Sequence, residues 1–72
     1  MNVSLPPKMQ TVNAWLKNAI SELNNSNIKS ASLDAELILA STLRKDRTYL
    51  HAHDNEAIPP RFLQIADARV AL

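Results

Sequence analysis

The sequence predicts an all-α fold, a small bundle of four helices, or five. Apolar residues recur every three to four positions along most of the chain, as they do on one face of an amphipathic helix. No stretch alternates apolar and polar residues over a useful length, which is the pattern of a half-buried strand. Glycine is absent from all 72 residues, so the tight two-residue turns of β-hairpins are disfavoured.

The first helix is predicted over residues 12–25. Thr11 is a suitable N-cap, because its hydroxyl can accept a hydrogen bond from a free backbone N–H of the first turn. The asparagine-rich residues 24–27 end the helix, since asparagine tolerates the left-handed backbone that a C-cap needs where glycine is missing. The helix carries one continuous apolar stripe, formed by Val12, Trp15, Leu16, Ala19, Ile20 and Leu23.

The second helix is predicted over residues 31–43, with Ser30 as its N-cap. Its apolar residues cover most of its circumference, which is typical of the central helix in a small bundle. Asp34 and Glu36 lie near its N-terminal end, where the helix dipole favours negative charge. We expect Asp34 to pair with Arg47 and Glu36 to be solvated. The expected core stripe is Leu33, Leu37, Ala40 and Leu43, broadened by Ile38 and Leu39.

Two further helices are predicted, a short one over residues 47–51 and a longer one over residues 60–72. Asp46 can cap the short helix, which is expected to carry Tyr49 and Leu50 inward. Pro60 suits the first position of the longer helix, where its missing N–H costs nothing. The polar, proline-terminated stretch between these two helices predicts a loop.

The chain is expected to divide into a flexible leader over residues 1–10 and a helical domain over residues 11–72. Pro6 and Pro7 favour extended backbone, which disfavours a helix in the leader. The last helix reaches residue 72 without a cap, so we expect the natural protein to continue beyond it. The side chains expected to anchor the core are Trp15, Leu16, Leu37, Tyr49 and Phe62, with Trp15 at the centre if its indole N–H finds a partner.

Composition and charge argue against several classes of function. The net charge is only +1, from eight Lys and Arg against seven Asp and Glu, and the two signs are interspersed. A nucleic-acid-binding domain usually concentrates basic side chains on one face, so no nucleic-acid partner is expected. The longest apolar run, residues 37–40, is far shorter than the roughly 20 residues that span a membrane, so no membrane partner is expected. The absence of cysteine suits a reducing compartment, and the expected location is cytoplasmic.

His51 and His53 invite a metal-site hypothesis, which their spacing disfavours. Two helical ligands of one metal prefer i, i+4 spacing, whereas positions i and i+2 point to different sides of a helix. The same geometry keeps Asp34 and Glu36 from converging on one bond as a general acid and base. The sequence therefore predicts no metal site and no catalytic site, and it favours surface histidines at a helix end.

Two segments of the chain resemble a known family in order and spacing. The first is Trp15-Leu16 followed by the Leu-Asp-Ala-Glu-Leu-Ile-Leu run of residues 33–39. The second is the Lys-Asp-Arg-Thr-Tyr-Leu run of residues 45–50. In both, the chain is similar to the N-terminal domain of release factor glutamine methyltransferases, which are protein-(glutamine-N5) methyltransferases. The resemblance covers about residues 11–72.

Two positions depart from that family's pattern, which often has glycine where this chain has Asn27 and Arg44. Asparagine is the mildest replacement for glycine in left-handed backbone. An arginine in that conformation would cost about 1–2 kcal/mol, so the second helix could end differently here.

The resemblance implies that the family's chemistry lies outside this chain. Such enzymes have a Rossmann-like C-terminal domain with a glycine-rich loop for S-adenosylmethionine and an Asn-Pro-Pro-Tyr motif that holds the target glutamine. This chain has no glycine, and its two Pro-Pro pairs follow Leu5 and Ile58 rather than asparagine. No catalytic or cofactor-binding residue is therefore expected here, and S-adenosylmethionine would belong to the parent enzyme.

The resemblance implies substrate recognition as the function. The domain would dock a peptide chain release factor while its own catalytic domain methylates the glutamine of a Gly-Gly-Gln motif. Support of the hinge between the two domains is a structural alternative. A free-standing helical adaptor or DNA-binding domain without enzymatic role is another, although the second helix is too apolar and the third too short for a recognition helix. The candidate partner contacts are Lys45, Arg47, His51 and His53.

Overall fold

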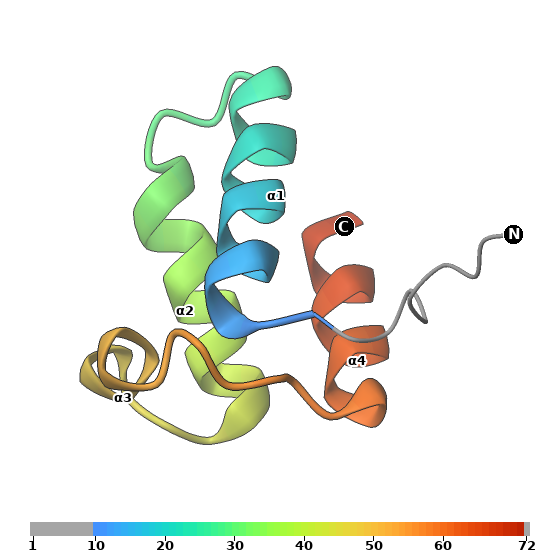
Figure 1. Ribbon diagram of the computed structural model, residues 1–72. Coiled ribbons are helices and arrows are strands. Elements are labelled where there is room, and N and C mark those ends of the chain that lie inside the picture. The colour runs from blue at the N-terminus through green and yellow to red at the C-terminus, as the bar shows by residue number, and fades with distance from the viewer. Residues whose placement is uncertain (1–9, 72) are drawn as a thin grey trace, which may run out of the picture.

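The computed structural model describes residues 10–71, which form four helices and no strand (Figure 1). The all-α bundle of four helices is therefore confirmed. Each predicted helix boundary within this range agrees with the structure to within one residue. The leader predicted for residues 1–10, except Gln10, and the predicted helix end at Leu72 lie outside the described residues. The helices are α1 (Val12–Asn25), α2 (Ala31–Leu43), α3 (Arg47–Ala52) and α4 (Pro60–Ala71).

The second helix is central, as its apolar circumference predicts. Figure 1 shows α1 and α2 side by side and antiparallel, with α4 beside them and the short α3 across the C-terminal end of α2. α2 contacts each of the other three helices. A helix that is covered on several sides must be apolar on several sides, which explains why α2 lacks a polar face.

Only part of the predicted stripe of α2 enters the core: Leu39 and Ala40 are buried, and Ile38 and Leu43 pack against them. Leu33 and Leu37 are 41% and 48% exposed, whereas Ala35 and Leu39 are fully buried. Alanines on the buried face let the backbone of a neighbouring helix approach closely. Because α2 is apolar nearly all round, its periodicity could not select between two apolar faces. Leu37, predicted as a core anchor, is therefore a surface residue.

The other predicted anchors lie in or against the core. Trp15 is 2% exposed, and its indole N–H donates a hydrogen bond of 2.8 Å to Asp67 Oδ1 on α4. This bond supplies the polar partner that a buried tryptophan needs. Leu16, Tyr49 and Phe62 are partly buried and pack against the central cluster. The largest fully buried side chains are Leu39, Leu50 and Ile58, which were not among the predicted anchors.

Side-chain caps begin two of the helices as predicted. Thr11 accepts a hydrogen bond of 3.1 Å from the Ala14 N–H, and Asp46 accepts one of 2.9 Å from the Tyr49 N–H. Ser30 precedes α2 but makes no side-chain capping bond. Its hydroxyl instead donates to Asp34 Oδ2 at 3.2 Å.

Left-handed residues end α1 and α2 without glycine. Asn27 has a φ angle of 63° and Arg44 one of 60°. At each end the N–H of the following residue returns to a carbonyl five positions earlier, from Ile28 to Leu23 at 3.0 Å and from Lys45 to Ala40 at 2.9 Å. This pattern is the Schellman motif, which usually has glycine at the left-handed position. The chain therefore ends α2 at the expected residue but with a strained arginine.

We expect the change Arg44→Gly to raise the free energy of unfolding by about 1 kcal/mol. Glycine removes the Cβ clash of left-handed backbone, and its larger unfolded-state entropy offsets only part of that gain. Urea unfolding followed by circular dichroism measures the difference. Arg44→Ala is the matched control, because alanine also lacks the guanidinium but keeps the Cβ. Equal stability of the glycine and alanine variants would contradict this account of α2's end.

The loop between α3 and α4 is held against the start of α1. The Val12 N–H donates to the Glu56 carbonyl at 2.9 Å, and the Asn13 N–H donates to the Asp54 carbonyl at 2.9 Å. These bonds satisfy two of the backbone donors that a helix N-terminus leaves free. The Ile58 N–H also donates to the Gln10 carbonyl at 2.8 Å. The loop thus has a fixed position beside α3, which matters for the surface described next.

Candidate docking surface on α2 and α3

The structure places the four predicted contact residues in and around α3, on two sides of this helix. Lys45 lies in the turn before α3, Arg47 and His51 lie one helical turn apart on α3, and His53 follows α3. Lys45, Arg47 and His51 are exposed, and His53 is half-buried. They form two small clusters, one around Glu36 and one around Tyr49.

The first cluster joins α3 to α2 through Glu36. The Arg47 Nε donates to Glu36 Oε1 at 2.8 Å, and His51 Nε2 lies 3.6 Å from Glu36 Oε2. The Glu36 side chain is only 12% exposed, so the prediction that it is solvated was wrong. The predicted Asp34–Arg47 pair was also wrong, because Arg47 reaches Glu36. Glu36 therefore orients the Arg47 guanidinium by a hydrogen bond and lies near His51 on the outer surface of α3.

The second cluster is built on the ring of Tyr49. The His53 imidazole stacks on this ring with centroids 4.0 Å apart and planes 20° apart, and the Lys45 Nζ lies 5.0 Å from the ring centroid. The Tyr49 hydroxyl donates to Glu56 Oε1 at 3.2 Å. Desolvation raises the pKa of Tyr49 above its ordinary value of 10.0, and the Glu56 carboxylate raises it further. The phenol is therefore a neutral hydrogen-bond donor at neutral pH.

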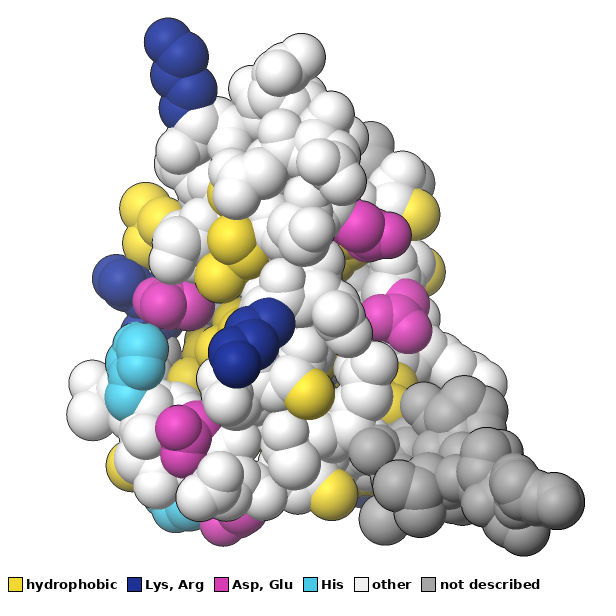
Figure 2. Space-filling model, turned by 45° about the horizontal axis from the view of Figure 1, so that its top comes forward, with side chains coloured by type: hydrophobic (Ala, Val, Ile, Leu, Met, Phe, Trp, Pro, Cys, Tyr) yellow, Lys and Arg dark blue, Asp and Glu magenta, His cyan; other side chains and the backbone are white. Residues whose placement is uncertain are grey.

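The two exposed leucines of α2 lie beside the first cluster. Leu33 and Leu37 are four residues apart, so they project from the same side of the helix, and Glu36 is three residues from Leu33. Figure 2 shows hydrophobic, basic, acidic and histidine side chains next to one another along the left edge of the molecule. We call this surface the α2–α3 face. It consists of Leu33, Glu36, Leu37, Lys45, Arg47, Tyr49, His51, His53 and Glu56.

A small apolar pocket adjoins the α2–α3 face where α3 meets the loop before α4. Its volume is about 200 Å³. The Tyr49 ring forms one wall, and Lys45 and Glu56 also line it. Its remaining lining residues are Val12, Leu43, Ala57, Ile58, Pro59 and Phe62.

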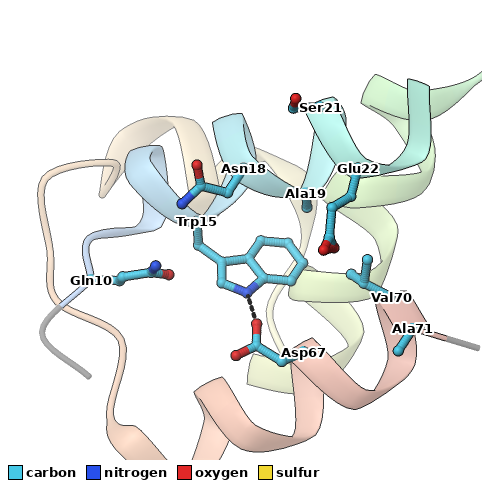
Figure 3. A pocket seen from close by; sticks show the side chains of 9 residues that line it. All are labelled: Gln10, Trp15, Asn18, Ala19, Ser21, Glu22, Asp67, Val70 and Ala71. Atoms are coloured by element: carbon cyan, nitrogen blue, oxygen red, sulfur yellow. Dashed lines mark hydrogen bonds between the residues drawn. The ribbon is translucent and has the colours of Figure 1, made fainter. Parts of the chain in front are cut away.

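A larger groove of about 590 Å³ lies between α1 and α4 (Figure 3). Trp15 forms its floor, and Glu22 and Asp67 supply carboxylates from its two walls. The Asp67 carboxylate is already bonded to the indole N–H. The groove also includes Gln10 and Ala71, the first and last described residues. The Trp15–Asp67 hydrogen bond joins α1 to α4 across this groove.

A comparison with protein families matches the PrmC N-terminal domain over residues 14–71, which is most of the chain. The chain belongs to this family. The match confirms the resemblance carried by residues 33–39 and 45–50, and it places the chain in a family of methyltransferases. No curated protein and no solved structure matches the chain.

Within residues 10–71 of this PrmC N-terminal domain, no group of three or more His, Asp or Glu side chains is arranged to hold a metal ion. His51 and His53 do not converge, because one faces Glu36 and the other stacks on Tyr49. No helix among the described residues is long and apolar enough to cross a membrane.

The sequence indicates the four basic residues as candidate contacts of the PrmC N-terminal domain, but it does not indicate the acidic side chains that lie beside them. The i, i+4 spacing of Arg47 and His51 places both on one side of α3. Glu36 is 11 residues from Arg47 along the chain, so this ion pair depends on how α3 folds back on α2. Glu56 lies in a loop, where no periodicity indicates its direction. The Tyr49–His53 spacing of four residues was the available signal for their stacking.

Proposed function

We propose that this PrmC N-terminal domain docks a peptide chain release factor for the methyltransferase to which it belongs. The observation that carries the proposal is the α2–α3 face, where an exposed leucine pair lies beside Glu36, which is bonded to Arg47. Protein interfaces are enriched in aromatic residues and arginine around an apolar centre, with a polar rim. The family membership supports the choice of a release factor as the partner.

The side chains of this face are oriented before any partner binds. The bond to Glu36 restricts the Arg47 guanidinium, and His53 and Lys45 both lie against the Tyr49 ring. A side chain that is already ordered loses less conformational entropy on binding, which leaves more of the contact energy for affinity. The face is therefore suited to a modest, partly polar contact with another protein.

Methyl transfer is assigned, in this proposal, to another part of the parent enzyme that binds S-adenosylmethionine. The 72 residues contain no glycine from which a nucleotide-binding loop could be built. The contribution of the α2–α3 face would be to hold the release factor so that its glutamine stays close to the methyl donor. Binding energy of this kind is equal in the ground state and the transition state, so it lowers the KM for the release factor.

Substitution of the leucine pair in the full methyltransferase tests the proposal. We expect Leu33→Gln combined with Leu37→Gln to raise the KM for the release factor about tenfold, which corresponds to about 1.4 kcal/mol of lost contact energy. Glutamine keeps the helix propensity, so the fold is preserved. The kcat should be unchanged, because the lost contact is equal in the ground and transition states.

Ile65→Gln is the matched control, since Ile65 is 44% exposed on α4, outside the α2–α3 face. A leucine variant with the same KM as the wild-type enzyme would contradict docking through this face. A loss confined to kcat would instead favour support of the hinge between the domains. Steeply salt-dependent binding of the chain to duplex DNA would favour the DNA-binding alternative.

A further inference from the structure

The pocket between α3 and the loop before α4 is the right size for one side chain of a partner. Its volume of about 200 Å³ lies below the roughly 300–1,000 Å³ of pockets that hold whole small-molecule ligands. The walls that face it are mainly apolar, including Val12, Phe62 and the Tyr49 ring. Apolar pockets of this kind hold the anchor residue of a protein interface, which is often aromatic.

Two charged side chains line the pocket, Glu56 and Lys45, and they differ in whether they have a partner. The Glu56 carboxylate accepts the Tyr49 hydroxyl at 3.2 Å and lies 3.9 Å from His53 Nε2. Among residues 10–71, Lys45 forms no salt bridge, and its ammonium lies 5.0 Å from the centroid of the Tyr49 ring. Residues 1–9 contain no aspartate or glutamate that could neutralise it. The pocket therefore offers a cation to a bound group, while its carboxylate is already engaged.

We propose that this pocket takes one large apolar side chain of the docked protein, with a carboxylate beside that side chain paired to Lys45. This inference rests on the proposed function, because the pocket shares Lys45, Tyr49 and Glu56 with the α2–α3 face. It adds the chemistry of the recognised segment, which is an aromatic or long aliphatic residue next to an acidic one. A segment with a basic residue at that place would be repelled by Lys45 and selected against.

A small aromatic acid tests the pocket without a release factor. The probe is 3-phenylpropionate, added to the 72-residue chain while the backbone amide signals are followed by NMR, with the neutral 3-phenylpropionamide as its matched control. We expect the acid to bind with a Kd on the order of millimolar, as is usual for a ligand of about 11 non-hydrogen atoms. The signals of Lys45, Tyr49, Ala57 and Phe62 should move most, and the amide should bind several-fold more weakly.

Two variants separate the apolar and charged parts of the proposed site. Ala57→Leu places a larger side chain on the pocket wall and should abolish binding of both probes. Lys45→Ala should make the acid and the amide bind equally. Lys29→Ala is the charge control, because Lys29 precedes α2 at the end remote from α3.

Each of three results would overturn the proposal. The first is equal affinity of the acid and the amide for the wild-type chain, and the second is unchanged binding of the probes to Ala57→Leu. The third is a shift of the pocket signals with protein concentration alone, which would indicate a second copy of the chain as the occupant. A release factor could bind equally to wild type and Ala57→Leu but more weakly to the Leu33→Gln/Leu37→Gln variant. This result would contradict the proposed role of the pocket but not the docking function. Loss of docking itself is measured separately, as the KM of the Leu33→Gln/Leu37→Gln methyltransferase for the release factor.

Discussion

Replacement of Trp15 by alanine is expected to lower the free energy of unfolding by about 3–5 kcal/mol, the usual cost of removing a buried aromatic side chain. The indole is 2% exposed and is the floor of the groove between α1 and α4. It also bonds to Asp67, so its loss removes both side-chain packing and a hydrogen bond between α1 and α4. For a 72-residue domain this is a large part of the total stability.

The two parts of the Trp15 effect can be measured separately. Asp67→Ala keeps the ring but leaves the indole N–H without its partner, which should cost about 1–3 kcal/mol. Because the chain has a single tryptophan, unfolding in urea is followed by far-ultraviolet circular dichroism rather than by fluorescence. A Trp15→Ala variant within 1 kcal/mol of wild type would show that the core does not depend on this ring.

The second large effect is expected at Leu39, where alanine should cost about 2–5 kcal/mol. Leu39 is fully buried and lies on the face of α2 that enters the core. Leu37→Ala is the matched control on the same helix, with an expected change within about 0.5 kcal/mol, because its side chain is 48% exposed. Urea unfolding of the two variants compares the two faces of α2 directly.

If Leu39→Ala does not fold, Leu39→Met keeps the comparison possible, since a volume-conserving change usually costs less than about 1.5 kcal/mol. Equal destabilisation by Leu37→Ala and Leu39→Ala would contradict the orientation of α2. It would indicate that the side of α2 with Leu33 and Leu37 enters the core.

The helix boundaries could be predicted because local chemistry determines them. Thr11 and Asp46 each bond to the backbone three residues ahead, and Asn27 adopts the left-handed backbone that asparagine tolerates. Such contacts lie within one turn of the chain, so they can be inferred without knowledge of the fold. Arg44 shows the limit of this reasoning, because its φ angle of 60° opposes the propensity of arginine.

The orientation of α2 could not be predicted, because its two apolar faces are nearly equivalent in sequence. Small residues decide the outcome, since Ala31 and Ala35 allow close helix packing where Leu33 and Leu37 would hold the helices apart. The positions of Glu36 and Glu56 on the α2–α3 face could not be predicted for a related reason. Glu36 meets Arg47 only through the turn between α2 and α3.

An NMR titration of the 72-residue chain with a release factor tests docking through the α2–α3 face most directly. We expect the backbone signals of Leu33, Leu37, Arg47 and His51 to shift in a saturable manner, with signals from the groove at Trp15 unchanged. The Leu33→Gln/Leu37→Gln variant should weaken this binding about tenfold. Shifts centred on the α1–α4 groove, or no shifts at all, would contradict the assignment of release factor docking to this surface.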